Sequence, residues 1–326
     1  MKKIVVIGNS PSGVKALQAI RAADSQCDLT IFTLDGFYPY HRELFADILL
    51  KKIKEDKIFC RPKEFYQTNR INVILERPIA RVNFRKKRIT TEEKDQIDFD
   101  LLIITDTPQI KFPDIKGTGK SGVFAFLRLA EFKKMISALP LVETVVIESN
   151  SLDGVRLADA FKKKGKEVIL VVSSERIFSQ GIEETSFAAI AQALEENGIR
   201  LMTGHSIAEI LGDADMKAIR LRSGKVIAAE MAVFTEILPD LRIFADTELK
   251  TDQKILVDSS FRTNIDGVFA VDYAARCEEN VNVPHLTLLS DISGQPIFFQ
   301  PAVSPVQILI GQTEITLSSP TAAFVP

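Results

Sequence analysis

Apolar and polar positions along the first 32 residues follow a strand, helix, strand order. Lys3 to Ile7 is an apolar run of strand length, and Leu29 to Phe32 is a second one. Between them, Val14, Leu17 and Ile20 recur at the spacing of a helix that covers about residues 14–23. Two neighbouring parallel strands need a crossover, and a helix supplies it here. The pattern therefore predicts a βαβ unit in a parallel sheet.

The same order returns in the middle of the chain, where a second helix is also predicted to end at an Asn-Gly pair. The elements of this second unit are a strand at 144–147, a helix that ends near Lys164 and Gly165, a strand at 167–172, a helix at 183–196 and a strand at 199–202. The sequence thus predicts an α/β fold with two Rossmann-like dinucleotide-binding domains.

Short strands and turns fill the rest of the chain. Antiparallel strands are predicted at 73–75, 80–84 and 88–90, a hairpin at 218–227, and two core strands at 255–258 and 267–271. The tail carries Pro284, Pro296, Pro301, Pro305, Pro320 and Pro326. We expect irregular packing segments there, and no separate core.

Composition narrows the classes of protein that are expected. The 326 residues carry a net charge of −2 and are 46% apolar, which is ordinary for a globular protein and gives no basic footprint for nucleic acid. Apolar runs are too short to span a bilayer, and Met1 leads directly into a strand. Three scattered cysteines and three scattered histidines build no disulfide framework and no local metal site. We expect a cytoplasmic, unprocessed protein without membrane insertion.

The turn after the first strand has the form of a phosphate-binding loop. A glycine-rich turn that leads into a helix binds pyrophosphate, because the helix presents unpaired N–H groups and glycine lets the backbone approach. Gly8 and Gly13 keep the outer positions of a GxGxxG spacing, and Ser10 replaces the middle glycine. Two interpretations of the Ser10 hydroxyl stay open: it donates to a phosphate, or it blocks one.

The corresponding turn of the second unit is more altered. Ser149 and Ser151 stand at the first two glycine positions, Gly154 keeps the third, and Glu148 adds negative charge beside them. Weak nucleotide binding and retention of the fold without a nucleotide are both open interpretations.

Motifs further along the chain resemble those of the FAD-dependent pyridine nucleotide-disulfide oxidoreductase superfamily, which includes NADH oxidases, rubredoxin and ferredoxin reductases and the flavin segment of nitrite reductases. Residues 38–47, with Arg42, resemble its PYxRxxLS segment. Residues 99–108, with Thr105, resemble YDxLxIATGSRP, and Asp106 replaces the glycine. Residues 262–273 resemble RTSxxxIFAAGD, with Asp272 at the glycine and Tyr273 at the aspartate.

The resemblance implies a discontinuous FAD-binding domain, residues 1–111 and 244–326, with an NAD(P)-binding-like domain, residues 112–243, inserted in it. It implies an FAD-dependent NAD(P)H oxidoreductase that passes electrons through flavin to a protein or metal-centre acceptor, with a redox protein as partner. The residues assigned to FAD are Gly8, Ser10, Gly13, Arg42, Thr105 and Asp272, and those assigned to NAD(P)H are Ser149, Ser151 and Gly154. No catalytic acid or base is assigned.

A second hypothesis is a non-catalytic family member that acts as a binding or assembly subunit with altered or empty nucleotide sites. It rests on the lost glycines and on the short C-terminal segment, since only about 50 residues follow Ala275 where the family has a third domain of about a hundred. In many members of the family the third domain carries much of the dimer interface, so the oligomeric state of this chain stays open, a dimer included. Cys60 is expected to be a small buried residue and not a redox thiol.

Overall fold

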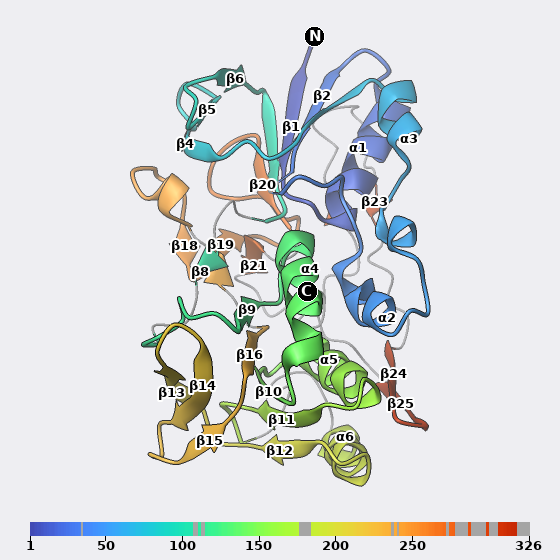
Figure 1. Cartoon of the computed structure of the whole chain (residues 1–326). Coiled ribbons are helices and arrows are strands. Elements are labelled where there is room, and N and C mark those ends of the chain that lie inside the picture. The colour runs from blue at the N-terminus through green and yellow to red at the C-terminus, as the bar shows by residue number, and fades with distance from the viewer. Residues whose placement is uncertain are drawn as a thin grey trace.

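The protein consists of two α/β units stacked end to end, with the N-terminus at the outer end of the first (Figure 1). The computed structural model describes residues 1–33, 35–106, 110–111, 115–175, 184–235, 238–239, 241–271, 274–277, 286–287, 298–299 and 306–317. In this part of the chain, no helix is long and apolar enough to cross a membrane.

The first unit is built on a five-stranded parallel sheet in the order β20-β7-β1-β2-β3. Its strands are β1 (Lys3–Ile7), β2 (Asp28–Phe32), β3 (Ile71–Ile74), β7 (Leu101–Ile104) and β20 (Val268–Ala270), and its helices are α1 (Pro11–Ala23) and α3 (Lys63–Thr68). The predicted α/β class with parallel sheets is confirmed. β20 returns to this sheet after the whole second unit has been completed.

The strand predicted at 73–75 lies in a different arrangement from the one expected. It belongs to β3, which pairs parallel with β2 from Leu29 opposite Ile71 to Phe32 opposite Ile74. The segment between β2 and β3 includes α3 and is long enough for a crossover, so the chain enters β3 in the same direction as β2. The other two expected strands are β4 (Ile79–Asn83) and β5 (Arg88–Thr91), and with β6 (Gln96–Asp98), which was not predicted, they form an antiparallel sheet.

The second unit repeats the parallel plan in the order β12-β11-β10-β16-β9. Its elements are β9 (Val123–Ala125), α4 (Leu129–Ala138), η3 (Leu139–Leu141), β10 (Thr144–Glu148), α5 (Leu152–Lys163), β11 (Glu167–Val171), α6 (Glu184–Glu196), β12 (Arg200–Met202) and β16 (Met231–Phe234). An antiparallel sheet of β13 (Ile207–Gly212), β14 (Met216–Leu221) and β15 (Val226–Ala228) contains the predicted hairpin.

The remaining short elements are small sheets, strand pairs and single helical turns. Strand pairs or small sheets are formed by β8 (Ile110–Lys111) with β17 (Leu238–Pro239), by β18 (Thr251–Asp252), β19 (Lys254–Val257) and β21 (Ala275–Cys277), and by β22 (Leu286–Thr287) with β23 (Phe298–Phe299). Single turns are η1 (Arg42–Leu44), α2 (Phe45–Leu49), η2 (Glu55–Ile58) and η4 (Leu241–Phe244).

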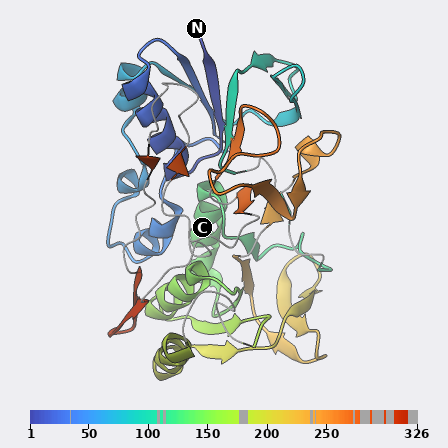
Figure 2. The ribbon, with the colours of Figure 1, turned by 180° about the vertical axis from the view of Figure 1, so that it is seen from behind.

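The hairpin of β24 (Val306–Ile310) and β25 (Thr313–Leu317) packs beside α5 and α6 of the second unit (Figure 2). Ile310 is fully buried, and the Gly311 N–H donates to the Asp159 carboxylate over 2.8 Å. The Asn197 amide donates to the Ile310 carbonyl over 3.4 Å. This hairpin contacts the second unit, although its sequence lies in the range predicted for the first.

An apolar core joins the two units. Tyr40, Phe45, Leu49 and Ile58 of the first unit are buried in the same cluster as residues of α4, β10 and α5. The ring of Phe45 stacks on that of Phe132 in α4, with 4.5 Å between the ring centroids. α2 is therefore part of the core of the second unit, although the chain reaches it between β2 and β3.

We expect Phe45→Ala to lower the free energy of unfolding by about 3–5 kcal/mol, because it removes a fully buried ring from the shared core. Urea unfolding followed by circular dichroism measures the change. Leu141→Ala is the control, since that side chain is 90% exposed and its removal should change stability by less than about 0.5 kcal/mol. Equal effects of the two substitutions would contradict a core shared between the units.

Candidate functional site

The first glycine turn lies at the carboxyl edge of the first sheet, between β1 and α1. Gly8 has φ of +125°, and a Cβ there would lie 2.1 Å from the Thr105 Oγ1. Thr105 is buried at the end of β7, and its hydroxyl donates to the Ile7 carbonyl over 3.1 Å. A Cβ on Gly13 would come within 3.0 Å of Val6. Both glycines are therefore required by the close approach of α1, β1 and β7.

Ser10 is the N-cap of α1. Its Oγ accepts the Gly13 N–H over 3.2 Å, and Pro11 occupies the first helical position and has no N–H. The side chain thus satisfies one of the donors that a phosphate uses at a helix N-terminus. Of the two interpretations left open above, this geometry favours competition between the hydroxyl and a phosphate for the Gly13 N–H.

A buried acid that the sequence analysis missed lies behind this turn. Asp35 is 6% exposed, and its two carboxylate oxygens accept from the Asn9 amide over 2.7 Å and from the Tyr40 hydroxyl over 2.8 Å. The Tyr40 oxygen in turn accepts the Leu129 N–H at the start of α4, over 3.0 Å. The signal was present, because an acid about 20 residues after the last glycine is the usual ribose ligand of a dinucleotide fold.

Burial controls the protonation of this pair. It raises the pKa of the Asp35 carboxyl, and the hydrogen bonds from Tyr40, the Phe37 N–H and Asn9 act in the opposite direction. Burial and the neighbouring Asp35 carboxylate raise the pKa of the Tyr40 phenol well above its ordinary range. The Tyr40 hydroxyl therefore keeps its proton, donates to Asp35 and accepts the Leu129 N–H of α4.

Arg42, assigned to FAD by the resemblance, is directed toward the second unit. Its guanidinium lies 3.1 Å from the carboxylate of Asp153 in the first turn of α5, and the two side chains are only 17% and 11% exposed. The neighbouring His41 ring contacts Glu43 over 2.7 Å. Asp272, the last residue assigned to FAD, lies outside the described residues.

The second turn, at the carboxyl end of β10, is filled by hydroxyl groups. Ser149 is fully buried, and its Oγ accepts from the Thr235 hydroxyl over 2.5 Å and from the Ser151 N–H over 3.0 Å. The Ser151 and Thr235 hydroxyls are 3.3 Å apart. A Cβ on Gly154 would lie 2.1 Å from the Ser149 Oγ, so this glycine makes room for Ser149. We call Ser149, Ser151 and Thr235 the hydroxyl cluster.

Asn150 connects the ends of β10 and β11 across the same turn. Its amide donates to the Ser173 hydroxyl over 2.9 Å, and its carbonyl oxygen accepts the Ser174 hydroxyl over 3.0 Å. The structure therefore brings together the three residues assigned to NAD(P)H, and it bonds their polar groups to one another and to neighbouring strands.

The thiol of Cys60 is 8% exposed, and burial raises its pKa to about 12. A thiol in this state stays protonated and is a poor nucleophile at neutral pH. The interpretation of Cys60 as a small buried residue fits this environment.

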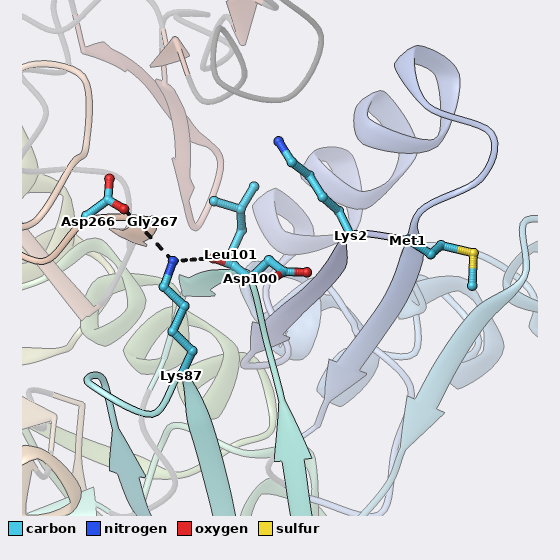
Figure 3. Close-up of a pocket in the computed structure, with 7 residues that line it drawn as sticks. All are labelled: Met1, Lys2, Lys87, Asp100, Leu101, Asp266 and Gly267. Carbon is cyan, nitrogen blue, oxygen red and sulfur yellow. Dashed lines mark hydrogen bonds and ion pairs between the residues drawn. The ribbon is translucent and has the colours of Figure 1, made fainter.

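A shallow hollow of about 560 Å³ lies at the amino ends of β1, β7 and β20 (Figure 3). The Lys87 ammonium crosses it, 3.9 Å from Asp266 and 3.4 Å from the Asp100 carbonyl. Nucleotides bind at the carboxyl ends of parallel strands, and this hollow is at the opposite edge.

The comparisons with known proteins agree with this fold. The profile of the pyridine nucleotide-disulphide oxidoreductase family matches residues 2–283, and the chain belongs to this family. Members of the family are FAD-dependent oxidoreductases that use NAD(P)H. The resemblance stated from the sequence is thereby confirmed.

Individual relatives are distant. The chain is 23% identical to nitrite reductase [NAD(P)H] of Bacillus subtilis over 276 residues, which is 84% of this chain and 34% of that protein. It is 23% identical to rubredoxin-NAD(+) reductase of Ectopseudomonas oleovorans over 82% of this chain and 70% of that one. The structure of a ferredoxin reductase from Rhodopseudomonas palustris superposes with a TM-score of 0.84 at 17% identity, covering 98% and 83% of the two chains.

The two turns differ in how well they fit the cofactors of the family. The first keeps two glycines whose Cβ positions are closed by the packing of β1 and β7, and it keeps a buried acid beyond the next strand. These features fit FAD, with Gly8, Gly13 and Asp35 as the residues that would hold it. The second turn has lost two glycines, its Ser151 N–H and its hydroxyls are bonded to one another, and the Asp153 carboxylate lies in the first turn of α5; this set does not fit a pyridine dinucleotide.

We expect the stability of the protein to depend on Asp35 below neutral pH. Because the pKa of Asp35 is raised in the folded state, the folded protein holds this proton more tightly than the unfolded chain. Stability should fall as pH rises from the ordinary value of 3.8 through the raised value. Asp35→Asn should remove this part of the fall, as measured by urea unfolding at a series of pH values.

Asp213→Asn, at an exposed acid, is the matched control and should leave the pH profile unchanged. A profile of Asp35→Asn that is parallel to that of the unaltered protein would show that the carboxyl does not titrate with folding.

Proposed function

We propose that this chain is an FAD-dependent oxidoreductase that carries electrons through flavin to a redox protein partner. The observation that carries the proposal is the first turn, where Gly8 and Gly13 stand between β1, α1 and β7 with no space for a side chain. Family membership supports it, and so do relatives whose names specify reductases of rubredoxin and nitrite. The family's ordinary donor is NAD(P)H, and the altered second turn of this chain does not fit it.

The residues of the first unit have distinct roles in this proposal. Gly8 and Gly13 let the backbone approach a pyrophosphate, and Asp35, held by Asn9 and Tyr40, lies at the distance along the sequence from Gly13 that is usual for the ribose ligand. Bound FAD supplies the electron-transfer chemistry, and the protein positions it. Ser10 must give up its bond to the Gly13 N–H before a phosphate takes that donor.

The domain division is part of the same proposal. β20 joins the first sheet, and β9, β10, β11, β12 and β16 form the second, which supports an FAD-binding domain of residues 1–111 and 244–326 interrupted by residues 112–243. The chain spans about a third of the nitrite reductase and 70% of the rubredoxin reductase, so their activities as whole proteins are not transferred to it.

The alternative is a binding or assembly subunit without redox activity. The filled second turn favours it. The two functions differ in one property, because only the oxidoreductase binds flavin.

The first test is the visible absorption spectrum of the purified protein, before and after incubation with FAD. We expect bands near about 370 and 450 nm, the ordinary positions for bound flavin. Protein that stays colourless with excess FAD would contradict the proposal and support the alternative.

A second expectation concerns Ser10. Ser10→Gly frees the Gly13 N–H for a phosphate and costs α1 only a few tenths of a kcal/mol as an N-cap. We expect FAD to bind about fivefold more tightly, which corresponds to roughly 1 kcal/mol, the net value of one hydrogen bond. Titration followed by flavin fluorescence measures this affinity.

Ser10→Thr keeps the capping hydroxyl and should show no gain in affinity. Weaker binding by Ser10→Gly than by the unaltered protein would mean that the hydroxyl donates to the phosphate and does not compete with it.

A further inference from the structure

The N-terminus of α5 is crossed by an ion pair that connects the two units. Arg42 comes from η1 of the first unit and Asp153 from the second position of α5, and the two groups lie 3.1 Å apart with little exposure to solvent. We call this pair the Arg42–Asp153 latch. It lies at the helix end where a dinucleotide fold receives the pyrophosphate.

The charge at this helix end is already balanced. The Asp153 carboxylate occupies the first turn of α5, where the helix dipole favours a negative group, and Arg42 neutralises it. A pyrophosphate bound there would have to lie beside this carboxylate and would compete with it for Arg42. The N-terminus of α5 therefore disfavours the binding of a second anion.

The floor of the turn is closed as well. In a dinucleotide fold, the glycines at the first two positions let the phosphates approach the backbone. Here serines replace both glycines, the Ser149 hydroxyl is buried against Gly154 of α5, and the Ser151 N–H is bonded to Ser149. Glu175 still matches a nucleotide site by its position, since it lies about 20 residues after Gly154, and it is exposed.

A movement of the two units would not open the turn at low cost. Tyr40 binds the N-terminus of α4, and Phe45 and Leu49 are buried against α4 and α5 beside the latch. Separation of the units would expose this apolar core to water. The latch, the hydroxyl cluster and the shared core all act at the same turn.

We propose that the second unit has exchanged its pyridine-nucleotide site for an interdomain clamp, in which the Arg42–Asp153 latch and the hydroxyl cluster close the turn and exclude NAD(P)H. The inference concerns the donor side of the proposed function, and it leaves the FAD site of the first unit unaffected. Asp153 then helps to hold the two units together, and the hydroxyl cluster closes the turn within the second unit.

Direct binding tests the exclusion. The purified protein is titrated with NADH and with NADPH up to about 1 mM, the upper end of ordinary enzyme–substrate affinities, and nucleotide fluorescence is followed. We expect no saturable binding. Saturation at micromolar nucleotide would overturn the proposal. The FAD content is measured separately, by visible absorbance. A missing flavin site and a functional nucleotide site therefore give different results.

Thermal unfolding tests the clamp. Arg42→Gln and Asp153→Asn should each lower the melting temperature by about 5–10 °C, because each leaves a nearly buried charge without its partner. The double variant should lose less than the sum of the two single losses. Lys133→Gln is the control, since its ion pair with Glu55 also joins the two units but is 40% and 47% exposed.

Additive losses, or losses no larger than that of Lys133→Gln, would show that the pair does not clamp the units and would overturn this part of the proposal. Asp153→Asn keeps the shape of the side chain, so at least one variant is expected to fold. The nucleotide titration uses the unaltered protein, and it tests by itself whether NAD(P)H is excluded.

Discussion

The arrangement of this protein depends on the burial of α2 against α4 and α5. The segment from residue 40 to residue 58 leaves the first sheet and contributes four buried apolar side chains to the largest core of the molecule. This packing fixes the carboxyl edges of both sheets relative to one another. It also brings η1 to the start of α5, so that Arg42 and Asp153 meet. The polar contacts between the units are thus consequences of an apolar one.

Much of the fold is encoded locally and was predictable. Apolar periodicity gave both βαβ units, because strand and helix periods are short-range properties of the sequence. The direction of β3 was predicted wrongly, since the choice between parallel and antiparallel pairing is made by the crossover and not by the strand itself. Asp35 was findable by its spacing from Gly13. The pairing of Arg42 with Asp153 was not, because it depends on how the two units pack.

The two turns show that loss of a glycine has different consequences in different surroundings. At Ser10 the new side chain caps α1 by accepting the Gly13 N–H, and both flanking glycines remain. At Ser149 the new side chain is buried beneath the helix and requires Gly154 for its own space. Counting glycines in the two motifs does not separate these cases, whereas the hydrogen-bond partners do.

The cap that Ser10 provides affects whether the first unit needs a bound ligand in order to fold. The first N–H groups of a helix have no hydrogen-bond partner within the helix, so a helix that binds a phosphate there lacks these bonds until the ligand is bound. α1 satisfies part of its own N-terminus, and Asn9 and Tyr40 already hold the carboxylate behind it. The Gly13 N–H and the Asp35 carboxylate therefore need no ligand as a hydrogen-bond partner while the first unit folds.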